Sequence, residues 1–596
     1  MDVYIVKSIP TAYPVFYNDF RYEEQTVHSE SLQIDVRKHI HENQREILDE
    51  YESWHQEITT NILKKLGEEW WLLNESRIIA FYPEILDSLI YSAGLTRMCE
   101  EKNIEKVFIS NANCEVALYL NELGHNVIYH HDVDISESSV YSFENNINRN
   151  CLSRILSVVR EIISIVRVKI RCMGIKKYKD LEEACLNSQE HDIIFSMISK
   201  NIESKSLNDH YFGKISRDLI LSAENPILWI LRSSGASKRE MLSHMNKLEN
   251  EGYKSLILEN EISIGDLILA AIRGFLMTRK LGKLINNLPS LKVLGFSSSN
   301  FVNIFFSFDP NLDGFLTMAG TKKILNRSKI KRLIYPYEEK ISERAILLNS
   351  KKSRSRNIIT IGYQHASTNQ AHSYLNYRSL ESQSPKPQQL LTTGSMQKSV
   401  LTDYWGWPEK KVKVLGSFRF QEQDSISKPL FSDKLQKILL IIGQAHELVR
   451  FEQLIKNNCA IFENSELMIR PYPFNWIDEQ NETLKKITKN LPDLKISKRN
   501  LIEDIEWANF TLSCSTSSGL ESILLGRINA YINLNNYIIQ DPYIDKFEEN
   551  CLYRIDSSQQ LIEFINFTKK LDLRGYNDFL KAQIDNAQKI YSNPLK

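Results

Sequence analysis

The sequence predicts an α/β protein built from two halves, and three observations indicate this. Residues 107–110 and 126–129 are short apolar runs, separated by a helix-like segment that Gly124 ends. Strand, helix, glycine, strand is the order typical of a parallel sheet. A second such rhythm begins at Ile358, and 596 residues are too many for one hydrophobic core.

The second half carries the stronger strand pattern. Apolar runs of strand length recur there, each separated from the next by enough residues for a helix. The predicted strands are residues 358–362, 389–392, 412–415, 438–442, 466–469, 510–513 and 530–532. Two further β-rich runs, 291–296 and 301–306, close the first half.

The boundary between the halves is predicted near residue 350. Residues 321–356 contain twelve Lys and Arg against three acidic residues, and 349–356 has the polar composition of a linker. We expect an N-terminal helical region at 1–100, packed on a first Rossmann-like domain at 101–348. A second Rossmann-like domain would span 349–575, and 576–596 would form a C-terminal helix that could cross back to the first domain.

Composition excludes several classes of protein. Lys and Arg number 74, as do Asp and Glu, and this balance argues against a dedicated nucleic-acid binder. The eight cysteines form no C-x-x-C pair, so neither a metal cage nor a disulfide framework is expected. The sequence shows no signal peptide and no apolar run of about 18 residues. These features predict a cytoplasmic protein.

Two apolar stretches are punctuated by basic residues. They are 153–175, with five Arg and Lys, and 264–285, with four. Such stretches could be basic amphipathic helices that lie on a membrane surface. The alternative is that they are ordinary helices whose Arg and Lys are solvated.

Four strands of the second half are followed by groups suited to a phosphate, at the strand end where open α/β sheets bind ligands. His365 follows the first, and Gly394, which would let a backbone approach closely, follows the second. Arg470 ends the third and could bind phosphate through two hydrogen bonds. Ser517 and Ser518 begin a helix after the fourth and could cradle an anion. Each also has a structural alternative: a core histidine, a turn glycine, a surface arginine and helix caps.

Three segments carry a resemblance to a known family. They read YPYE at 335–338, ERA at 343–345 and IGYQH at 361–365. They resemble the P-[FY]-E, E-R-A and G-Y-Q-H run of the bacterial GT-B glycosyltransferases of capsule, lipopolysaccharide and sialoside assembly. The resemblance covers roughly residues 300–535. It implies two Rossmann-like domains that face a cleft, with the nucleotide on the C-terminal domain.

Within that family, the enzymes that use CMP-Kdo or CMP-sialic acid share three markers. The acidic-Gly marker resembles DGFL at 313–316, and the Ser-Ser marker resembles Ser517-Ser518. RPYP at 470–473 falls where the His-Pro marker belongs. The sequence departs from the pattern at Leu312, where the group has an acid, and at Tyr472, where it has histidine.

The resemblance and the chemistry of sugar transfer together give a candidate site. A sugar hydroxyl is a poor nucleophile, so an inverting enzyme needs a carboxylate base, and a retaining enzyme can use a carboxylate nucleophile. Asp313 fits either role, or is a solvated turn residue. The expected catalytic set is Asp313, Glu338 and His365. The expected nucleotide-binding set is Gly362, Gln364, Gly394, Arg470, Pro473, Ser517, Ser518 and Glu521.

The expected function is transfer of a sugar from a nucleotide donor, CMP-linked keto sugars ahead of UDP-sugars, to a bacterial surface glycan. No metal and no cofactor is expected beside the nucleotide-sugar, although Asp132 and Asp134 have DxD spacing. A glycan or lipid-linked glycan would be the acceptor, with peripheral contact at the inner membrane and no nucleic-acid partner. Two alternatives stay open: a CDP-polyol phosphotransferase of the teichoic-acid type, and a non-catalytic GT-B-like assembly scaffold.

Overall fold

The computed structural model describes two large parallel sheets and the helices around them. The described residues are mainly 36–73, 190–198, 225–233, 236–285, 312–327, 329–353, 357–368, 385–417, 436–443, 465–471, 494–514, 516–532, 551–555 and 558–592, with short segments elsewhere.

The first sheet has seven parallel strands in the order β12-β11-β10-β9-β4-β5-β6. The chain adds strands outward from β4 on one side, then outward from β9 on the other. This is the doubly wound order of a Rossmann-like domain, in which ligands bind at the carboxyl edge near the reversal. The strands are β4 (His191–Met197), β5 (Ile227–Arg232), β6 (Lys254–Ile257), β9 (Ile330–Pro336), β10 (Ile359–Gln364), β11 (Gln389–Thr392) and β12 (Val412–Val414).

The second sheet repeats this topology with six parallel strands in the order β15-β14-β13-β16-β17-β18. Here the order reverses between β13 and β16. The strands are β13 (Gln436–Ile441), β14 (Ser465–Arg470), β15 (Lys495–Ile496), β16 (Phe510–Ser513), β17 (Ile528–Ile532) and β18 (Tyr553–Ile555). The seven strands predicted for the second half are confirmed, with ends that differ by about two residues at most.

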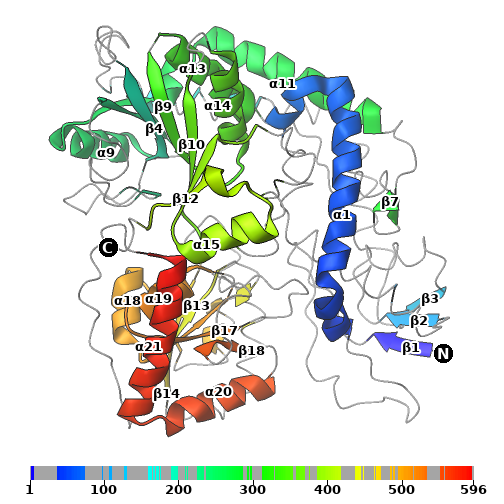
Figure 1. Ribbon diagram of the computed structural model, residues 1–596, viewed down its shortest axis with the longest axis vertical. Coiled ribbons are helices and arrows are strands. Elements are labelled where there is room, and N and C mark those ends of the chain that lie inside the picture. Colours follow the sequence, from blue (N-terminus) through cyan, green and yellow to red (C-terminus); the bar gives the residue numbers. More distant parts are fainter. Residues whose placement is uncertain are drawn as a thin grey trace.

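Helices accompany each sheet and complete two domains, one above the other in Figure 1. We call the seven-stranded sheet with its helices the first domain and the six-stranded sheet with its helices the second domain. Two Rossmann-like domains in one chain form the GT-B architecture, so the predicted fold class is confirmed. The helices of the first domain are α9 (Lys238–Asn250), α10 (Leu258–Glu261), α11 (Ile264–Ile285), α13 (Asp313–Arg327), α14 (Ile341–Lys352) and α15 (Ser395–Ser399). Those of the second are α18 (Leu501–Trp507), α19 (Ser518–Leu524), α20 (Ser558–Lys570) and α21 (Leu573–Ile590).

The predicted boundary at residues 348/349 is wrong. Strands β10, β11 and β12 pair in the first sheet, so the sheets divide the chain between Val414 and Gln436. The predicted linker begins inside α14, where buried Asn349 donates hydrogen bonds to the Met318 carbonyl and to Thr321 Oγ1. Its basic residues had suggested a linker, but Lys351 and Lys352 form the exposed last turn of that helix.

The N-terminal region is less purely helical than expected. The long helix α1 (Val36–Leu66) buries Tyr51, Trp54, Ile58 and Ile62, whose spacing of three and four residues places them on one face. Residues Asp2–Ile5, however, form strand β1, which pairs in parallel with β2 (Lys106–Ile109), and β2 pairs with β3 (Asn126–Tyr129). Strands β7 (Lys292–Val293) and β8 (Phe296–Ser297) pair in antiparallel orientation, and the predicted strand at 301–306 lies outside the described residues.

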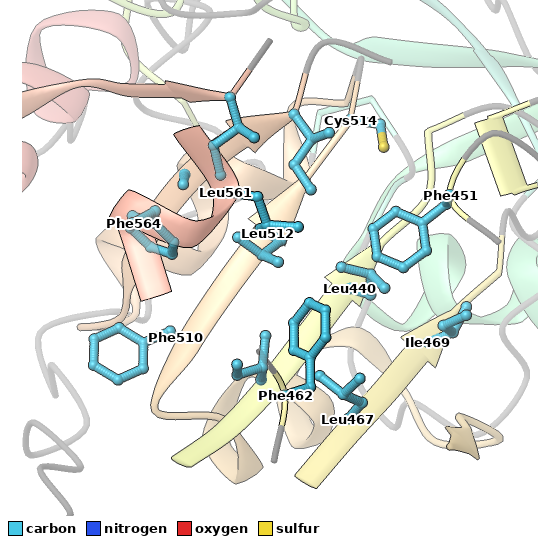
Figure 2. Close-up of a cluster of buried hydrophobic side chains, with 14 of the residues drawn as sticks. Leu440, Phe451, Phe462, Leu467, Ile469, Phe510, Leu512, Cys514, Leu561 and Phe564 are labelled. Atoms are coloured by element: carbon cyan, nitrogen blue, oxygen red, sulfur yellow. The ribbon is translucent and has the colours of Figure 1, made fainter. Parts of the chain in front are cut away.

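The core of the second domain shows why these strands form a sheet buried on both faces. Leu440, Ile469 and Leu512 come from neighbouring strands and point to one face, where helix α20 adds Leu561 and Phe564 (Figure 2). All five side chains are almost completely buried. Near-continuous apolar runs of this kind are typical of parallel strands covered on both sides.

The C-terminal helix α21 joins the two domains. It packs beside α19 in the second domain, and its end reaches the first domain next to α15. Thr393 Oγ1 donates to the Ile590 carbonyl (2.9 Å), and the Ser417 N–H donates to the Ser592 carbonyl (2.8 Å). Thr393 and Ser417 follow β11 and β12, so the carboxyl edge of the first sheet lies at the junction between the domains.

Candidate functional site

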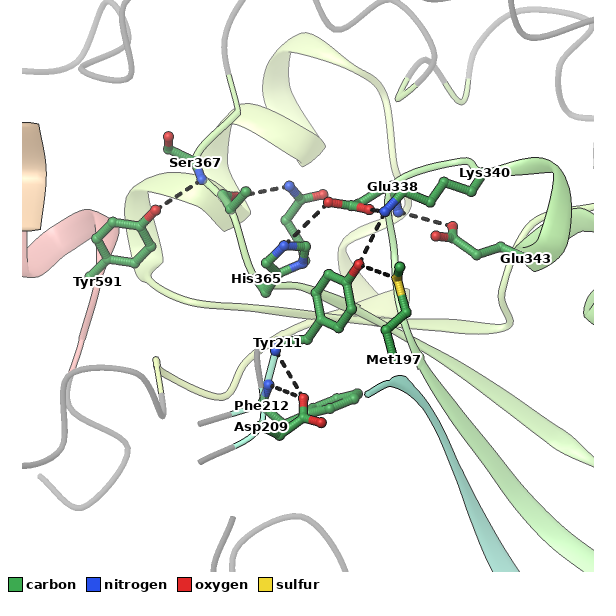
Figure 3. A network of polar contacts seen from close by, with 12 residues as sticks. Met197, Asp209, Tyr211, Phe212, Glu338, Lys340, Glu343, His365, Ser367 and Tyr591 are labelled. Atoms are coloured by element: carbon green, nitrogen blue, oxygen red, sulfur yellow. Dashed lines mark hydrogen bonds and ion pairs between the residues drawn. The ribbon is translucent and has the colours of Figure 1, made fainter. Parts of the chain in front are cut away.

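A network of ionisable side chains lies at the carboxyl edge of the first sheet, between β9 and β10 (Figure 3). Strand β9 ends at Pro336, and Glu339 then takes a positive φ of 54°. This left-handed conformation is uncommon for a residue with a side chain, and it turns the chain into α14. The turn brings Glu338 beside the end of β10, where His365 follows.

His365 and Glu338 form the centre of this network. Nε2 of His365 lies 3.3 Å from Oε1 of Glu338, and Lys340 pairs with the other carboxylate oxygen. Burial would raise the pKa of Glu338, but the hydrogen bond from His365 and the charges of His365 and Lys340 outweigh it and hold this pKa well below its usual range. The opposite ring atom, Nδ1 of His365, is buried and has no hydrogen-bond partner among the described residues.

Tyr211 closes one side of the network. Its ring meets the His365 imidazole edge-on, with centroids 4.7 Å apart, and its hydroxyl accepts a hydrogen bond from Lys340 Nζ at 3.1 Å. Asp209 holds the Tyr211 segment in place, because its Oδ1 accepts from the N–H groups of Tyr211 and Phe212. Burial, with the charge of Glu338, raises the pKa of Tyr211 to about 12. The hydroxyl therefore keeps its proton at neutral pH.

A second, fully buried ion pair braces the turn from inside. Arg344 Nε donates to Glu339 Oε2 at 2.9 Å, and the Tyr337 hydroxyl donates to Glu339 Oε1 at 2.6 Å. The Arg344 guanidinium also lies over the Trp71 ring. These contacts satisfy the buried Glu339 carboxylate and stabilise its left-handed backbone. The YPYE and ERA segments are thus one structural unit around Glu338.

Glu343 completes that unit. Its Oε2 accepts a hydrogen bond from the Glu338 N–H at 2.9 Å. Burial first, and then the charge of Glu338, raise the pKa of Glu343 well above its usual range. The two carboxyl groups therefore differ in their favoured form: Glu338 is held ionised, and the buried Glu343 is pushed toward the protonated form.

Asp313, the predicted catalytic carboxylate, is held by an arginine. It begins α13, and both of its oxygens face the guanidinium of Arg232 at the end of β5, one at 3.2 Å. Burial would lower the pKa of Arg232, but the Asp313 charge outweighs it, and the pKa of Arg232 lies above its usual range. Because Arg232 ends β5, Asp313 lies at the same carboxyl edge of the sheet as His365, which follows β10.

Gly362 and Gly394 have structural explanations. A Cβ on Gly362 would lie 3.0 Å from Tyr337 Cβ and 3.1 Å from atoms of Pro387 and Leu390. A Cβ on Gly394 would lie 2.3 Å from the Lys589 carbonyl oxygen. Packing of neighbouring strands and the approach of α21, rather than room for a phosphate, account for these two glycines.

Gln364 lies beside His365 at the end of β10. Its Nε2 donates to the Ala366 carbonyl at 2.9 Å. Its Oε1 is buried without a hydrogen-bond partner among the described residues. An unsatisfied buried acceptor next to an unsatisfied buried imidazole nitrogen is what a site that awaits a polar ligand would show.

The other predicted nucleotide contacts lie in the second domain. Arg470 ends β14 and donates to Oδ2 of the buried Asp504 at 2.7 Å, so its charge already has a partner. Ser517 and Ser518 lie at the start of α19 after β16, and Glu521 lies within that helix. Pro473 is outside the described residues. The predicted nucleotide set is therefore split between the domains.

Sequence reasoning missed Tyr211, Lys340 and Arg232. Lys340 lies inside the YPYE–ERA unit and could have been noticed there as the cation nearest Glu338. Tyr211 lies about 130 residues earlier in a stretch without strand or helix periodicity, so no signal marked it. Arg232 ends an apolar strand, as Arg470 does, and that shared pattern was a usable clue.

The described residues contain neither a cluster of metal ligands nor a helix that could span a membrane. Among them, no three His, Cys, Asp or Glu side chains gather as a metal site would require. Within the same residues, no helix combines the length and the apolar character needed to cross a bilayer. Asp132 and Asp134 lie outside the described residues.

The sequence matches no protein-family model and no curated protein. Some solved structures match about two thirds of the chain at low similarity. The N-terminal domain of Candida albicans trehalose-6-phosphate phosphatase matches with 9% identity and a TM-score of 0.39, over 69% of this chain and 96% of that one.

Two further structures match over a similar length. UDP-GlcNAc 2-epimerase from Neisseria meningitidis bound to UDP-GlcNAc has 12% identity and a TM-score of 0.37, covering 68% of this chain and 99% of that one. Anabaena Alr3699/HepE in complex with UDP and glucose has 11% identity and a TM-score of 0.37, covering 67% and 96%. The GT-B architecture of this chain is defined by its own two strand orders.

Proposed function

We propose that this protein is a glycosyltransferase that moves a sugar from a nucleotide donor to a hydroxyl of a glycan acceptor. One observation carries the proposal: the His365–Glu338 pair at the carboxyl edge of the first sheet, at the junction of two Rossmann-like domains. A carboxylate that holds one imidazole nitrogen and leaves the other without a partner is the arrangement of a general base.

The reaction assigned to this pair is a single displacement. The acceptor hydroxyl gives its proton to Nδ1 of His365 while its oxygen bonds to the anomeric carbon of the donor. The bond from that carbon to the nucleotide phosphate oxygen breaks, and the phosphate leaves with the electron pair. Glu338, held ionised by its surroundings, stabilises the imidazolium that forms. A single displacement inverts the anomeric configuration.

Access to the base requires movement at the site. His365 is about 5% exposed, with the Tyr211 ring against it. An acceptor reaches Nδ1 only if the side chains over it give way. Catalytic contacts often reach their productive geometry only in the complex with substrate.

The nucleotide is assigned to the second domain. Ser517 and Ser518, after β16, offer their hydroxyl groups at the carboxyl edge of that sheet, while the Ser518 N–H donates to Thr516 Oγ1. The resemblance of DGFL and of the serine pair to the CMP-sugar group places CMP-linked keto sugars ahead of UDP-sugars. A bacterial surface glycan is the acceptor class that the same resemblance suggests.

The test is donor binding and turnover by the full chain. Calorimetry with CMP, UDP and CDP in parallel should show binding of one nucleotide, and the matching sugar donor should then be consumed in the presence of a glycan acceptor. Ser517→Ala and Ser518→Ala should weaken that binding roughly 10- to 100-fold, since each removes a hydrogen bond to a charged oxygen. Binding of CDP with transfer of a polyol phosphate would replace the proposal by the phosphotransferase alternative. No binding of any nucleotide would favour a scaffold.

A further inference from the structure

Helix α11 presents an apolar face to solvent. Five large side chains of this helix are between 46% and 70% exposed, and they are Ile264, Ile268, Leu269, Ile272 and Leu276. The opposite side of the helix is buried by Leu267, Ala270, Met277 and Leu281. Helices on the surface of a domain normally have polar residues on the outer face. This helix is largely apolar on both faces over its first four turns.

Basic residues share the exposed face. Arg273, Arg279, Lys280 and Lys283 are all exposed, and at about 3.6 residues per turn they fall in the same half of the helix circumference as the exposed Ile and Leu. Asp266 is the one acidic residue of α11, and it is paired with Lys323 of α13. The exposed face is thus apolar toward its N-terminus and purely cationic toward its C-terminus.

A second helical segment has the same character and lies close by. Val159, Ile163, Val166 and Ile170, spaced four, three and four residues apart, are 39–59% exposed. Lys169 of this segment donates a hydrogen bond to the carbonyl of Ile262, just before α11. Arg160, Arg167 and Arg171 are exposed beside the apolar residues. Two neighbouring elements therefore repeat one surface chemistry, and Figure 1 shows α11 at the end of the first domain remote from the second domain.

We propose that the exposed face of α11, with the neighbouring segment 159–172, docks the protein on the surface of an anionic lipid bilayer. The Ile and Leu side chains would enter the boundary between headgroups and acyl chains, and the Arg and Lys side chains would contact lipid phosphates.

The charge of the exposed face favours an anionic bilayer over a second copy of the chain as its partner. In an antiparallel two-fold dimer through α11, the cationic end of one helix would meet the apolar end of the other, where the acidic residue of α11, Asp266, is already paired with Lys323. Burial of unpaired cations is strongly unfavourable. At an anionic bilayer the same cations stay in the hydrated headgroup layer and find phosphates there.

The proposal is independent of the transferase assignment, because vesicle binding is measured without substrate. The full chain would be sedimented with phosphatidylcholine vesicles and with phosphatidylcholine–phosphatidylglycerol vesicles, at low and at physiological salt. We expect binding to the anionic vesicles alone, weakened by salt.

Two variants test the apolar insertion and the phosphate contacts separately, and each has a matched control. Ile268→Ser/Ile272→Ser should lower the vesicle partition coefficient about tenfold or more. Ile502→Ser/Leu573→Ser, at two comparably exposed positions of the second domain, is the matched control and should change nothing. Arg279→Gln/Lys280→Gln/Lys283→Gln should lower binding roughly 10- to 100-fold. Lys485→Gln/Lys498→Gln/Lys570→Gln removes three exposed charges of the second domain as its control.

Three results would overturn the proposal. One is the absence of binding to anionic vesicles at low salt. Another is binding that both test variants leave unchanged. The third is a stable dimer in solution that Ile268→Ser/Ile272→Ser dissociates, which would assign the face to a second copy of the chain.

Discussion

Nε2 of His365 lies 3.3 Å from Oε1 of Glu338, across the gap between the ends of two adjacent parallel strands. We expect His365→Gln and Glu338→Gln each to lower turnover by on the order of 10²–10⁴, because His365 is the proposed general base and Glu338 is the carboxylate that supports it. Donor affinity should change little, since the nucleotide is assigned to the other domain. Steady-state kinetics of the full chain, with thermal unfolding as a check on folding, provide the measurement. Near-normal turnover in both variants would show that the His365–Glu338 pair is not the general base.

Asp313 provides a comparison within the same sheet edge. Asp313→Asn leaves Arg232 without its charged partner, so we expect a loss of about 1–2 kcal/mol in the free energy of unfolding. Turnover should fall less than in His365→Gln. Urea unfolding and kinetics on both variants decide the matter. A turnover loss of about 10² or more with unchanged stability would return the catalytic role to Asp313.

Glu343 gives the protein a pH-dependent stability. Because its pKa is raised in the folded state, the folded protein keeps this proton over a range in which the unfolded chain, with a glutamate pKa of about 4.3, has lost it. The free energy of unfolding therefore falls as pH rises through that range. Glu343→Gln removes this loss, so the variant should gain stability over the wild type as pH rises from about 4 toward neutrality.

Glu338 should act with the opposite sign. Its folded pKa is lowered, so its contribution is present above the unfolded pKa of about 4.3 and is lost as pH falls through the folded value. Glu338→Gln should therefore cost stability near neutral pH and little in acid. Chemical unfolding at several pH values measures both variants, with the exposed Glu249→Gln as control. Parallel curves for all three variants would contradict these assignments.

Arg470 should prove structural. Asp504 is completely buried, and Arg470→Ala leaves it without its cation, so we expect a loss of about 3–5 kcal/mol. Arg470→Lys keeps the charge and should cost less. Thermal unfolding and nucleotide calorimetry on the lysine variant separate the two roles. A stable lysine variant that has lost nucleotide affinity would restore the predicted phosphate contact.

Gly394 tests the junction of the domains. In Gly394→Ala the new Cβ meets the backbone carbonyl oxygens of Lys589 and Ile590, which cannot rotate away as a side chain would. We expect a loss of about 1–3 kcal/mol. Gly265→Ala, whose Cβ would have no contact closer than 3.7 Å, is the matched control and should be neutral or slightly stabilising in its helix. Equal melting temperatures for the two variants would show that α21 adapts without cost.

The sequence by itself determined the fold class and the strands of the second half. Parallel strands covered on both faces must be almost wholly apolar, and this local pattern is legible in a single chain, as at 510–513 and 438–442. It also marked His365, which follows a predicted strand at the edge where open α/β sheets bind ligands, and the resemblance of the YPYE segment marked Glu338.

Only the tertiary structure decided where the domains divide and what each polar residue touches. Strand pairing across dozens of residues puts β10–β12 in the first sheet, and no local pattern records which sheet a strand joins. Tyr211 contacts His365 from a segment about 150 residues away in the sequence. The end of α21 packs against Gly394 from nearly 200 residues away. Such contacts depend on packing between distant segments. Gly362 and Gly394 were expected to leave room for a phosphate, but neighbouring parts of the chain pack against them instead.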